Sequence, residues 1–187
     1  MQKAHYSFLF TCFINLTSFA QADKCDTINW TKKTKLNWSN FKAKPDTASS
    51  FKAVSVAGIG YNAQNIGDTL MIGIHCSFYT CESWTKSGSG NLLKHEQTHF
   101  DIAEYFKRLF IKKLTASQLK RQSAFAQIQS IYEEIERLRD DFDNKYDSET
   151  NFSRNKAKQD KWMINIRMRI DKLNLIDKEQ VTIYLKD

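Results

Sequence analysis

One short run of this sequence has the residue types and spacing of a zinc-binding motif. His95 and His99 are four residues apart and Glu96 follows the first histidine, which gives the pattern HExxH. On a helix, residues four apart lie one above the other, so both imidazoles can reach one Zn2+ ion. Glu96 is turned by about 100° from His95, so it can lie beside the metal instead of binding it. Because zinc lowers the pKa of a bound water to about 7, the run predicts hydrolysis, with His95 and His99 as ligands and Glu96 as the general base.

The residues around the motif predict the helix that it needs. Apolar residues recur with the two histidines at three- and four-residue steps over 92–106, after a glycine- and serine-rich loop at 87–90. The same periodicity allows a plainer interpretation, in which both histidines are ordinary members of an apolar stripe. A third helix is expected over about 154–175. A second helix, between these two, is expected from an apolar seam at Ile128, Ile131, Ile135, Leu138 and Phe142.

Before the motif the pattern is that of strands. β-type residues at 51–63, a turn at 65–68 and a strict alternation over 69–79 predict antiparallel strands, and 181–185 predicts a last strand. The alternation places one set of side chains on a buried face: Leu70, Ile72, Ile74, Cys76 and Phe78. We therefore expect an α+β fold, a small antiparallel sheet followed by long packed helices with a zincin-like active-site helix.

The first twenty residues differ from the rest of the chain. Lys3 precedes an apolar run, and small residues at Ser18 and Ala20 occupy the positions that a signal peptidase reads. Residues 1–20 are therefore interpreted as a signal peptide cleaved after Ala20, although a buried N-terminal helix would have a similar composition. Cleavage would leave a single metallohydrolase domain over 21–187, secreted or periplasmic, with no membrane span in the mature chain.

The net charge of +7 allows nucleic acid, an anionic envelope surface or an acidic substrate as partners. The cations are scattered over the expected helices, as on solvated helix faces, and no nucleic-acid-binding motif accompanies them. Nucleic acid is therefore not expected as a partner.

Three cysteines remain after the expected cleavage, and none has the CxxC spacing of a zinc site. Cys76 and Cys81 are five residues apart at the end of a predicted strand and could meet across a short reversal. We therefore predict a Cys76–Cys81 disulfide in preference to a bond to Cys25.

A longer string resembles a known family. The run HEQTHFDIAE over 95–104 is similar to the motif of a bacterial family described as secreted zinc-dependent proteases, otherwise a domain of unknown function. Ser83-Trp84, the run 36–41 and the run 146–150 agree with that pattern, and the resemblance covers roughly residues 28–175. It implies zinc binding and cleavage of a peptide or protein substrate.

A zinc ion with catalytic function needs a third protein ligand. Asp101 and Glu104 point away from the two histidines by about 140° and 160° if the helix continues, and Glu104 is expected to pair with Arg108. Many members of the resembled family have a histidine just after the segment that matches 146–150, where this chain has Phe152. Carboxylates after the second long helix are the better candidates, Asp147 before Glu149, although Asp147 is equally well explained as a helix cap.

His75 is a further candidate, although a lone histidine on a strand is more often a surface residue. Two functions follow from this sequence. One is an exported zinc peptidase, and the other is a non-catalytic envelope binding module that keeps a degenerate, structural zinc site. An intact Glu96 favours the peptidase, because a structural site does not need a base.

Overall fold

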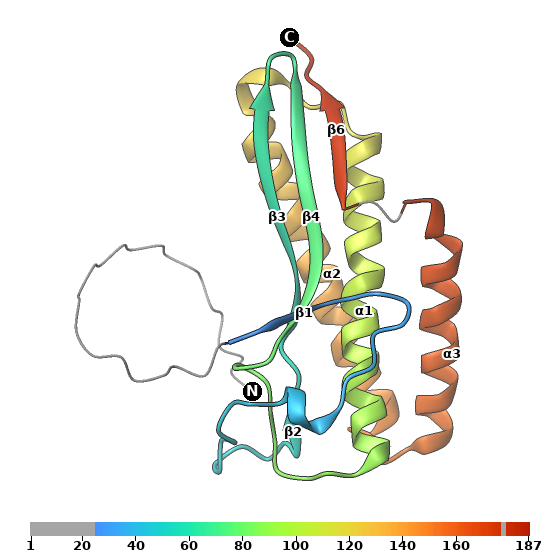
Figure 1. The fold of residues 1–187 in the computed structure, drawn as a ribbon. Coiled ribbons are helices and arrows are strands. Elements are labelled where there is room, and N and C mark those ends of the chain that lie inside the picture. The colour runs from blue at the N-terminus through green and yellow to red at the C-terminus, as the bar shows by residue number, and fades with distance from the viewer. Residues whose placement is uncertain (1–24, 177–178) are drawn as a thin grey trace, which may run out of the picture.

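An antiparallel hairpin and three long helices dominate residues 25–176 and 179–187, the part of the chain that the computed structural model describes (Figure 1). This is the predicted α+β fold, a small antiparallel sheet packed with long helices. The predicted signal peptide, with its cleavage after Ala20, lies outside the described residues. No helix among the described residues combines the length and the apolar character that a membrane crossing needs.

Strand β4 (Thr69–Tyr79) is the centre of the main sheet. It pairs with β3 (Ala57–Ile66) on one edge, while β6 (Gln180–Tyr184) and β1 (Thr27–Asn29) share its other edge end to end. The predicted alternation in β4 is confirmed, because all five apolar side chains assigned to its inner face are buried. Gly67, at φ 60°, lies in the tight turn between β3 and β4, where the left-handed conformation favours glycine.

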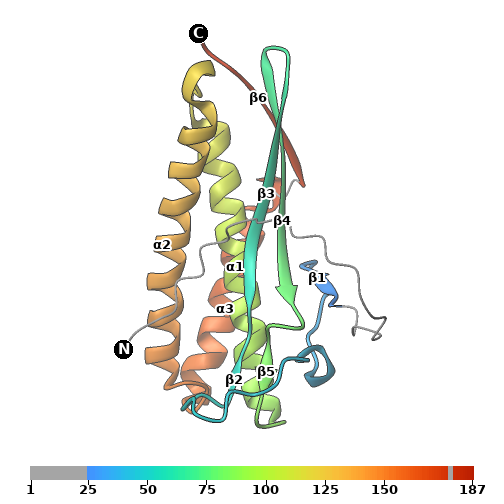
Figure 2. The same cartoon turned by 90° about the vertical axis from the view of Figure 1, so that its left-hand side faces the viewer.

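A separate two-stranded sheet lies beside the N-terminal end of the first helix (Figure 2). It pairs β2 (Ala53–Val54) with β5 (Trp84–Thr85). The strand predicted over 51–63 is therefore interrupted after Val54. The interruption has a physical cause, since the Ser55 N–H donates to the Glu96 carboxylate at 3.1 Å.

Helix α1 (Gly90–Ala116) contacts both other long helices, α2 (Ala124–Thr150) and α3 (Lys156–Lys172), and packs on β3 and β4 (Figures 1 and 2). α1 begins where its sequence predicts, because the hydroxyl of Ser89 accepts a hydrogen bond from the Leu92 N–H at 3.2 Å and caps the helix. Three single-turn helices complete the fold: η1 (Trp38–Asn40), η2 (Arg121–Ser123) and η3 (Asn174–Ile176).

The main core lies between α1, the inner face of the sheet and the facing sides of α2 and α3. Ile128 and Ile135 of the predicted α2 seam are buried in it. Leu138 is a correction, because it is 46% exposed although the spacing placed it in the seam. The apolar side of α2 continues past Leu138, because Phe142 packs against Phe106 of α1 with ring centroids 5.4 Å apart and Tyr146 is fully buried.

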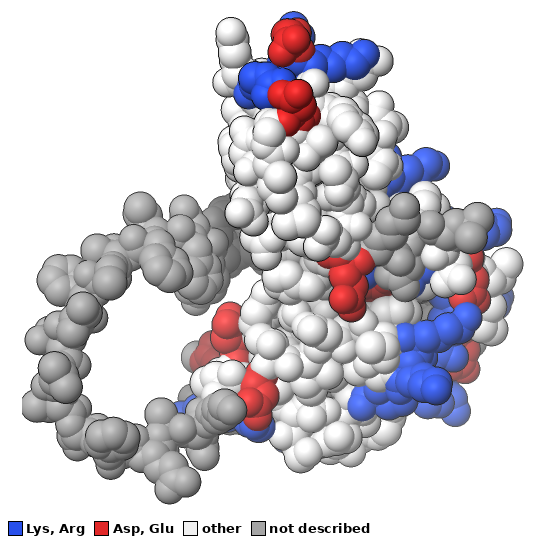
Figure 3. Space-filling view, turned by 45° about the horizontal axis from the view of Figure 1, so that its top comes forward, with Lys and Arg blue, Asp and Glu red and all other residues white. Residues whose placement is uncertain are grey.

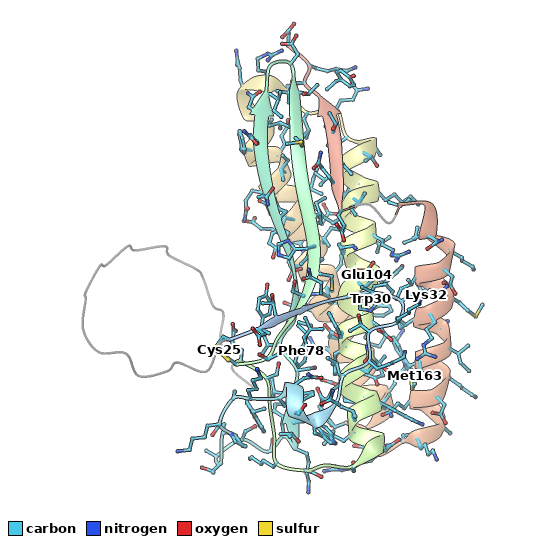
Figure 4. The ribbon with its side chains drawn as sticks, viewed as in Figure 1. Cys25, Trp30, Lys32, Phe78, Glu104 and Met163 are labelled. Atoms are coloured by element: carbon cyan, nitrogen blue, oxygen red, sulfur yellow. A yellow bond between two sulfur atoms is a disulfide. The ribbon has the colours of Figure 1, made fainter. Side chains whose placement is uncertain are left out.

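The disulfide is a second correction. Cys81 is bonded to Cys25 at the start of β1 (Figure 4), and the predicted Cys76–Cys81 bond is wrong. The register of β1 on β4 explains the pairing: Thr27 lies opposite Tyr79, so the same ladder continued by two residues sets Cys25 opposite Cys81. Cys76 is a free thiol on the buried face of β4, and burial raises its pKa well above the usual value.

The positive charge is divided over the surface seen in Figure 3. Lys and Arg side chains gather at the tip of the β3–β4 hairpin and on the side where α3 lies, with acidic side chains among them. At the hairpin tip, Arg121 forms ion pairs with Asp68 at 2.8 Å and with Asp187 at 3.3 Å.

Candidate metal centre

The HExxH run lies near the start of α1, on the side of that helix that faces α2. His95 and Glu96 are each only 4% exposed. α2 runs antiparallel to α1 (Figure 1), which brings the end of α2 beside the start of α1. Tyr146, buried on α2, directs its hydroxyl towards the His95 carbonyl oxygen at 3.4 Å and thus marks where the two helices meet.

Three side chains from these two helices converge on one point. The Nε2 atoms of His95 and His99 lie 3.3 Å apart, and each is 3.0 Å from Oδ1 of Asp147. The structure thus brings the predicted carboxylate, Asp147, directly to the two histidines of the motif. All three groups can act as ligands of a metal ion.

The size of this triangle fits zinc. Zinc bonds of 2.0–2.2 Å in a tetrahedral arrangement set neighbouring ligand atoms about 3.3 Å apart. The three edges measured here are 3.0, 3.0 and 3.3 Å. Two imidazoles and one carboxylate are also a ligand set found in zinc enzymes, where a fourth position stays open. His95, His99 and Asp147 could therefore hold a zinc ion without rearrangement of the backbone.

A second layer of contacts orients the histidines. Asp143 Oδ1 lies 2.8 Å from Nδ1 of His99, a contact that fixes the proton on Nδ1 and leaves the lone pair of Nε2 for the cluster. The ring of Tyr146 stacks on His95, with centroids 4.5 Å apart and an interplanar angle of 19°. Nδ1 of His95 is buried and has no hydrogen-bond partner among the described residues. In addition to the contacts of both rings with Asp147, His95 is held by packing on Tyr146 and His99 by a charged hydrogen bond to Asp143.

The electrostatics of the cluster favour a cation. Burial alone would lower the pKa of His99, but hydrogen bonds to Asp143 and Asp147 and their negative charges raise it well above its usual value. Burial alone would raise the pKa of Asp147, yet hydrogen bonds from His95 and His99 hold it well below its usual range. The metal-free cluster therefore keeps its carboxylate ionised and attracts a proton to His99, in the place where a metal ion would bring positive charge.

Glu96 lies in the same cleft as the cluster. This cleft has a volume of about 730 Å³ and is lined by Glu96, His95, His99 and Asp147 together with residues from β2 and the end of α2. One oxygen of Glu96, Oε2, accepts the hydrogen bond from the Ser55 N–H. Its carboxylate is thus oriented by the backbone next to β2.

The other residues considered from the sequence lie elsewhere. Asp101 accepts hydrogen bonds from Trp30 Nε1 at 2.9 Å and from Gln97 at 3.1 Å, so it ties β1 to α1. Glu104 pairs with Arg108 at 2.8 Å as predicted, and it lies on α1 beside Trp30 (Figure 4). These two carboxylates have structural roles.

Three further candidates also lie outside the cluster. Glu149 accepts from Trp162 Nε1 at 2.9 Å. His75 is exposed on β4 opposite Gly60, where a side chain on the glycine would collide with its imidazole. Phe152 lines the cleft at its rim, 5.8 Å from Phe51 between ring centroids.

Three supporting residues were not assigned roles from the sequence: Asp143, Tyr146 and Ser55. A signal for the first was present, because Asp143 and Asp147 are four residues apart, the same helical spacing as His95 and His99. Nothing in the sequence indicates which of the carboxylates on α2 faces which histidine, since that depends on how far the two helices are offset.

Comparison of the chain with protein-family models, with curated proteins and with solved structures gave no match. The site is therefore interpreted from its own geometry.

Proposed function

We propose that this protein is a zinc-dependent peptidase in which His95, His99 and Asp147 hold the metal and Glu96 is the general base. One observation carries the proposal: three ligand atoms form a triangle with edges of 3.0–3.3 Å on the floor of a cleft that also contains an oriented glutamate. The resemblance of the 95–104 run to secreted zinc-dependent proteases supports the same assignment.

The chemistry follows from the positions of these side chains. Zinc, when bound, acts as a Lewis acid that polarises a carbonyl and makes water a stronger nucleophile at neutral pH. Glu96 accepts the proton of the attacking water and can then pass it to the leaving amine. Asp143 keeps His99 in the tautomer that presents Nε2 to the metal, and Tyr146 restricts the rotation of His95.

Among the described residues β2 pairs with β5 alone, and its second edge beside the cluster supports a peptide as the substrate. The Lys86 N–H donates to the Lys52 carbonyl at 2.7 Å, which makes Lys52 and Lys86 a hydrogen-bonded pair of the antiparallel ladder. Such pairs alternate along the strand, so the N–H and C=O of Ala53 point away from β5. Ala53 is only 7% exposed, but it lines the cleft, and from there its backbone groups can pair with an extended chain as an added strand would.

We propose further that the mature chain is secreted or periplasmic. The Cys25–Cys81 disulfide supports export, because such bonds persist in oxidising compartments. The signal-peptide pattern over 1–20 supports it independently.

The test is metal analysis together with hydrolysis of a fluorescence-quenched casein by the exported protein. The wild type should contain about one zinc per chain and lose hydrolysis on chelation, and Glu96→Gln should keep zinc and lose hydrolysis. Glu133→Gln, at an exposed glutamate on α2, is the matched control and should change neither the zinc content nor the hydrolysis of casein. Zinc retained in His95→Ala and His99→Ala would overturn the assignment of the site.

The same measurements decide on the second candidate, a binding module with a structural zinc site. The burial of Glu96 and its hydrogen bond to the Ser55 N–H are compatible with that candidate as well, since they also suit a glutamate with a purely structural role. Stoichiometric zinc in a wild type that hydrolyses no casein would establish it in place of the peptidase.

A further inference from the structure

The two ends of the cleft differ in chemistry. The floor is the part of α1 that carries His95 and His99, and the walls are the β2 segment and the end of α2. Asn91, at the start of α1, donates a hydrogen bond to the Ser153 carbonyl oxygen, so the turn after α2 closes the cleft at that end. Asp140 lies on the α2 wall towards the opposite end, one helical turn before Asp143.

The end near Asn91 has an aromatic rim, which we define as Phe51 and Phe152. The two rings come from opposite walls, with centroids 5.8 Å apart and an interplanar angle of 54°. Both side chains remain accessible, Phe51 at 43% and Phe152 at 42%. Leu92 lines the same end of the cleft, so apolar surface continues from the rim towards the metal cluster.

The backbone that presents Phe152 is strained. Asn151, Phe152 and Ser153 have φ values of 48°, 50° and 71°, a left-handed conformation that a bulky aromatic residue rarely adopts. The Phe152 N–H bonds the Asp147 carbonyl oxygen at 2.9 Å, which holds the turn in this shape. The strain does not serve to bury Phe152, because the ring stays at the rim of the cleft, and strain of this kind gathers at ligand-binding sites.

The charges of the two ends are opposite. The side chain of Asp140 is 57% exposed, and the guanidinium of Arg139 lies 4.0 Å from it. Arg139 also donates to the Ala57 carbonyl oxygen, so it is not available to Asp140 alone. Lys52 and Arg154 line the aromatic end and would repel a cationic side chain there.

We infer that the cleft selects peptides with an apolar side chain on the aromatic rim and a cationic side chain, across the scissile bond, facing Asp140. The inference rests on the proposed function and adds the substrate class. Phe51, Phe152 and Asp140 are specificity-determining residues, and none of them contacts His95, His99 or Glu96 in the chemistry described above. Pairing with the Ala53 edge keeps the peptide extended, so its side chains reach both ends of the cleft.

The test measures peptide binding by fluorescence anisotropy with the zinc-loaded Glu96→Gln protein, which cannot consume the peptide. Four fluorescein-labelled octapeptides combine Leu or Ser at a first variable position with Arg or Glu at a second. Each peptide is also made with the two variable positions exchanged, because the direction in which a peptide would lie in the cleft is part of the test. In one order, Leu should tighten binding about tenfold over Ser, and Arg about fivefold over Glu. Phe51→Ala and Phe152→Ala should each reduce the Leu preference to below about threefold, and Asp140→Asn should remove the Arg preference.

Two matched controls come from the same helix. Phe125→Ala removes an aromatic ring that is 55% exposed and does not line the cleft. Asp141→Asn removes an exposed carboxylate one residue from Asp140 that also lies outside the cleft lining. Both controls should keep both preferences.

Equal binding of all peptides, absence of binding, or preferences that survive the rim and Asp140 substitutions would overturn the inference. The proposed function is judged separately, by zinc content and by hydrolysis of casein that depends on Glu96. A protein that cleaves casein but ignores these side chains would keep the function and lose the inference.

Discussion

Two regions of α1 bury charged or polar side chains, and the two regions differ in how the charges of these side chains are balanced. In the middle of the helix, Glu104 is fully buried between Lys107 at 3.0 Å and Arg108 at 2.8 Å. Arg108 also donates to the Ile170 carbonyl oxygen at 3.0 Å, which ties α1 to the end of α3. Here opposite charges meet within the protein.

Near the start of α1 the balance is different. Glu96, Asp143 and Asp147 gather around His95 and His99, and no lysine or arginine joins their contacts with the two histidines. The three ligand atoms converge on one point, and the only donors to Asp147 among their contacts are the two imidazoles, whose Nε2 atoms could bind a metal ion instead. The contrast teaches that buried charge alone does not identify a functional site. The sign of the imbalance does, because partly buried carboxylates gathered around two histidines favour the binding of a cation.

The largest effect should come from breaking the ion pairs of Glu104 in the middle of α1. Glu104→Gln keeps the shape of the side chain but removes the carboxylate between Lys107 and Arg108. The loss of a buried ion pair should lower the free energy of unfolding by about 3 kcal/mol, measured by urea denaturation. Zinc content per folded chain should stay unchanged. A loss of stability below about 1 kcal/mol would show that the ion network contributes little to the fold.

A substitution beside the metal cluster should change the affinity for zinc more than the stability of the fold. Asp143→Asn removes the negative charge at Nδ1 of His99 while keeping the size of the side chain. The zinc dissociation constant should rise about tenfold, as for other residues that orient a histidine ligand, and a competing chelator dye measures it. Asp141→Asn serves as the control on the same helix. An unchanged zinc affinity in Asp143→Asn would mean that packing alone fixes the His99 ring.

Zinc binding at the start of α1 should also depend on pH. The pKa of His99 in the metal-free protein is raised, so above its usual value of 6.5 this imidazole still binds a proton that zinc must displace. Zinc affinity should therefore rise about tenfold per pH unit from pH 6.5 up to the raised pKa of His99, and level off above it. In Asp143→Asn the levelling should occur at lower pH, because a carboxylate that raises the pKa is gone. Titrations with the chelator dye at pH 6.5–8.5 measure this, and an affinity independent of pH would contradict it.

Features of the fold and the site that depend on neighbouring residues could be predicted from the sequence better than features that depend on residues far apart in the chain. Local features depend only on neighbouring residues, and they were predicted directly. These features are the start and periodicity of α1, the alternation in β4 and the place of the HExxH run on a helix. The segment with Asp147 was also identified, because a helix hairpin must bring its end back to the start of α1, but the expectation that it follows the second helix is wrong, since α2 continues to Thr150.

Features that depend on register or helix offset were not predictable in the same way. The Cys25–Cys81 bond follows from the pairing of β1 with β4, which no local pattern states. The interruption at Ser55 follows from a hydrogen bond to Glu96, forty-one residues later in the chain. The roles of Asp143 and Tyr146 depend on the offset between α1 and α2, since one residue of shift would turn other side chains towards the histidines.

The smallest effect should come from the Tyr146 hydroxyl. Its ring is fully buried and stacks on His95, whereas its hydroxyl is 3.4 Å from the His95 carbonyl oxygen, long for an O–H···O hydrogen bond. If packing holds His95 and charge holds His99, Tyr146→Phe should change the zinc dissociation constant by less than about threefold and stability by less than about 1 kcal/mol. Tyr146→Leu, which removes the stacked ring, should weaken zinc more than Tyr146→Phe does. Equal zinc affinities in the two variants would show that the ring does not position His95, and that His95 needs another support within the helix pair.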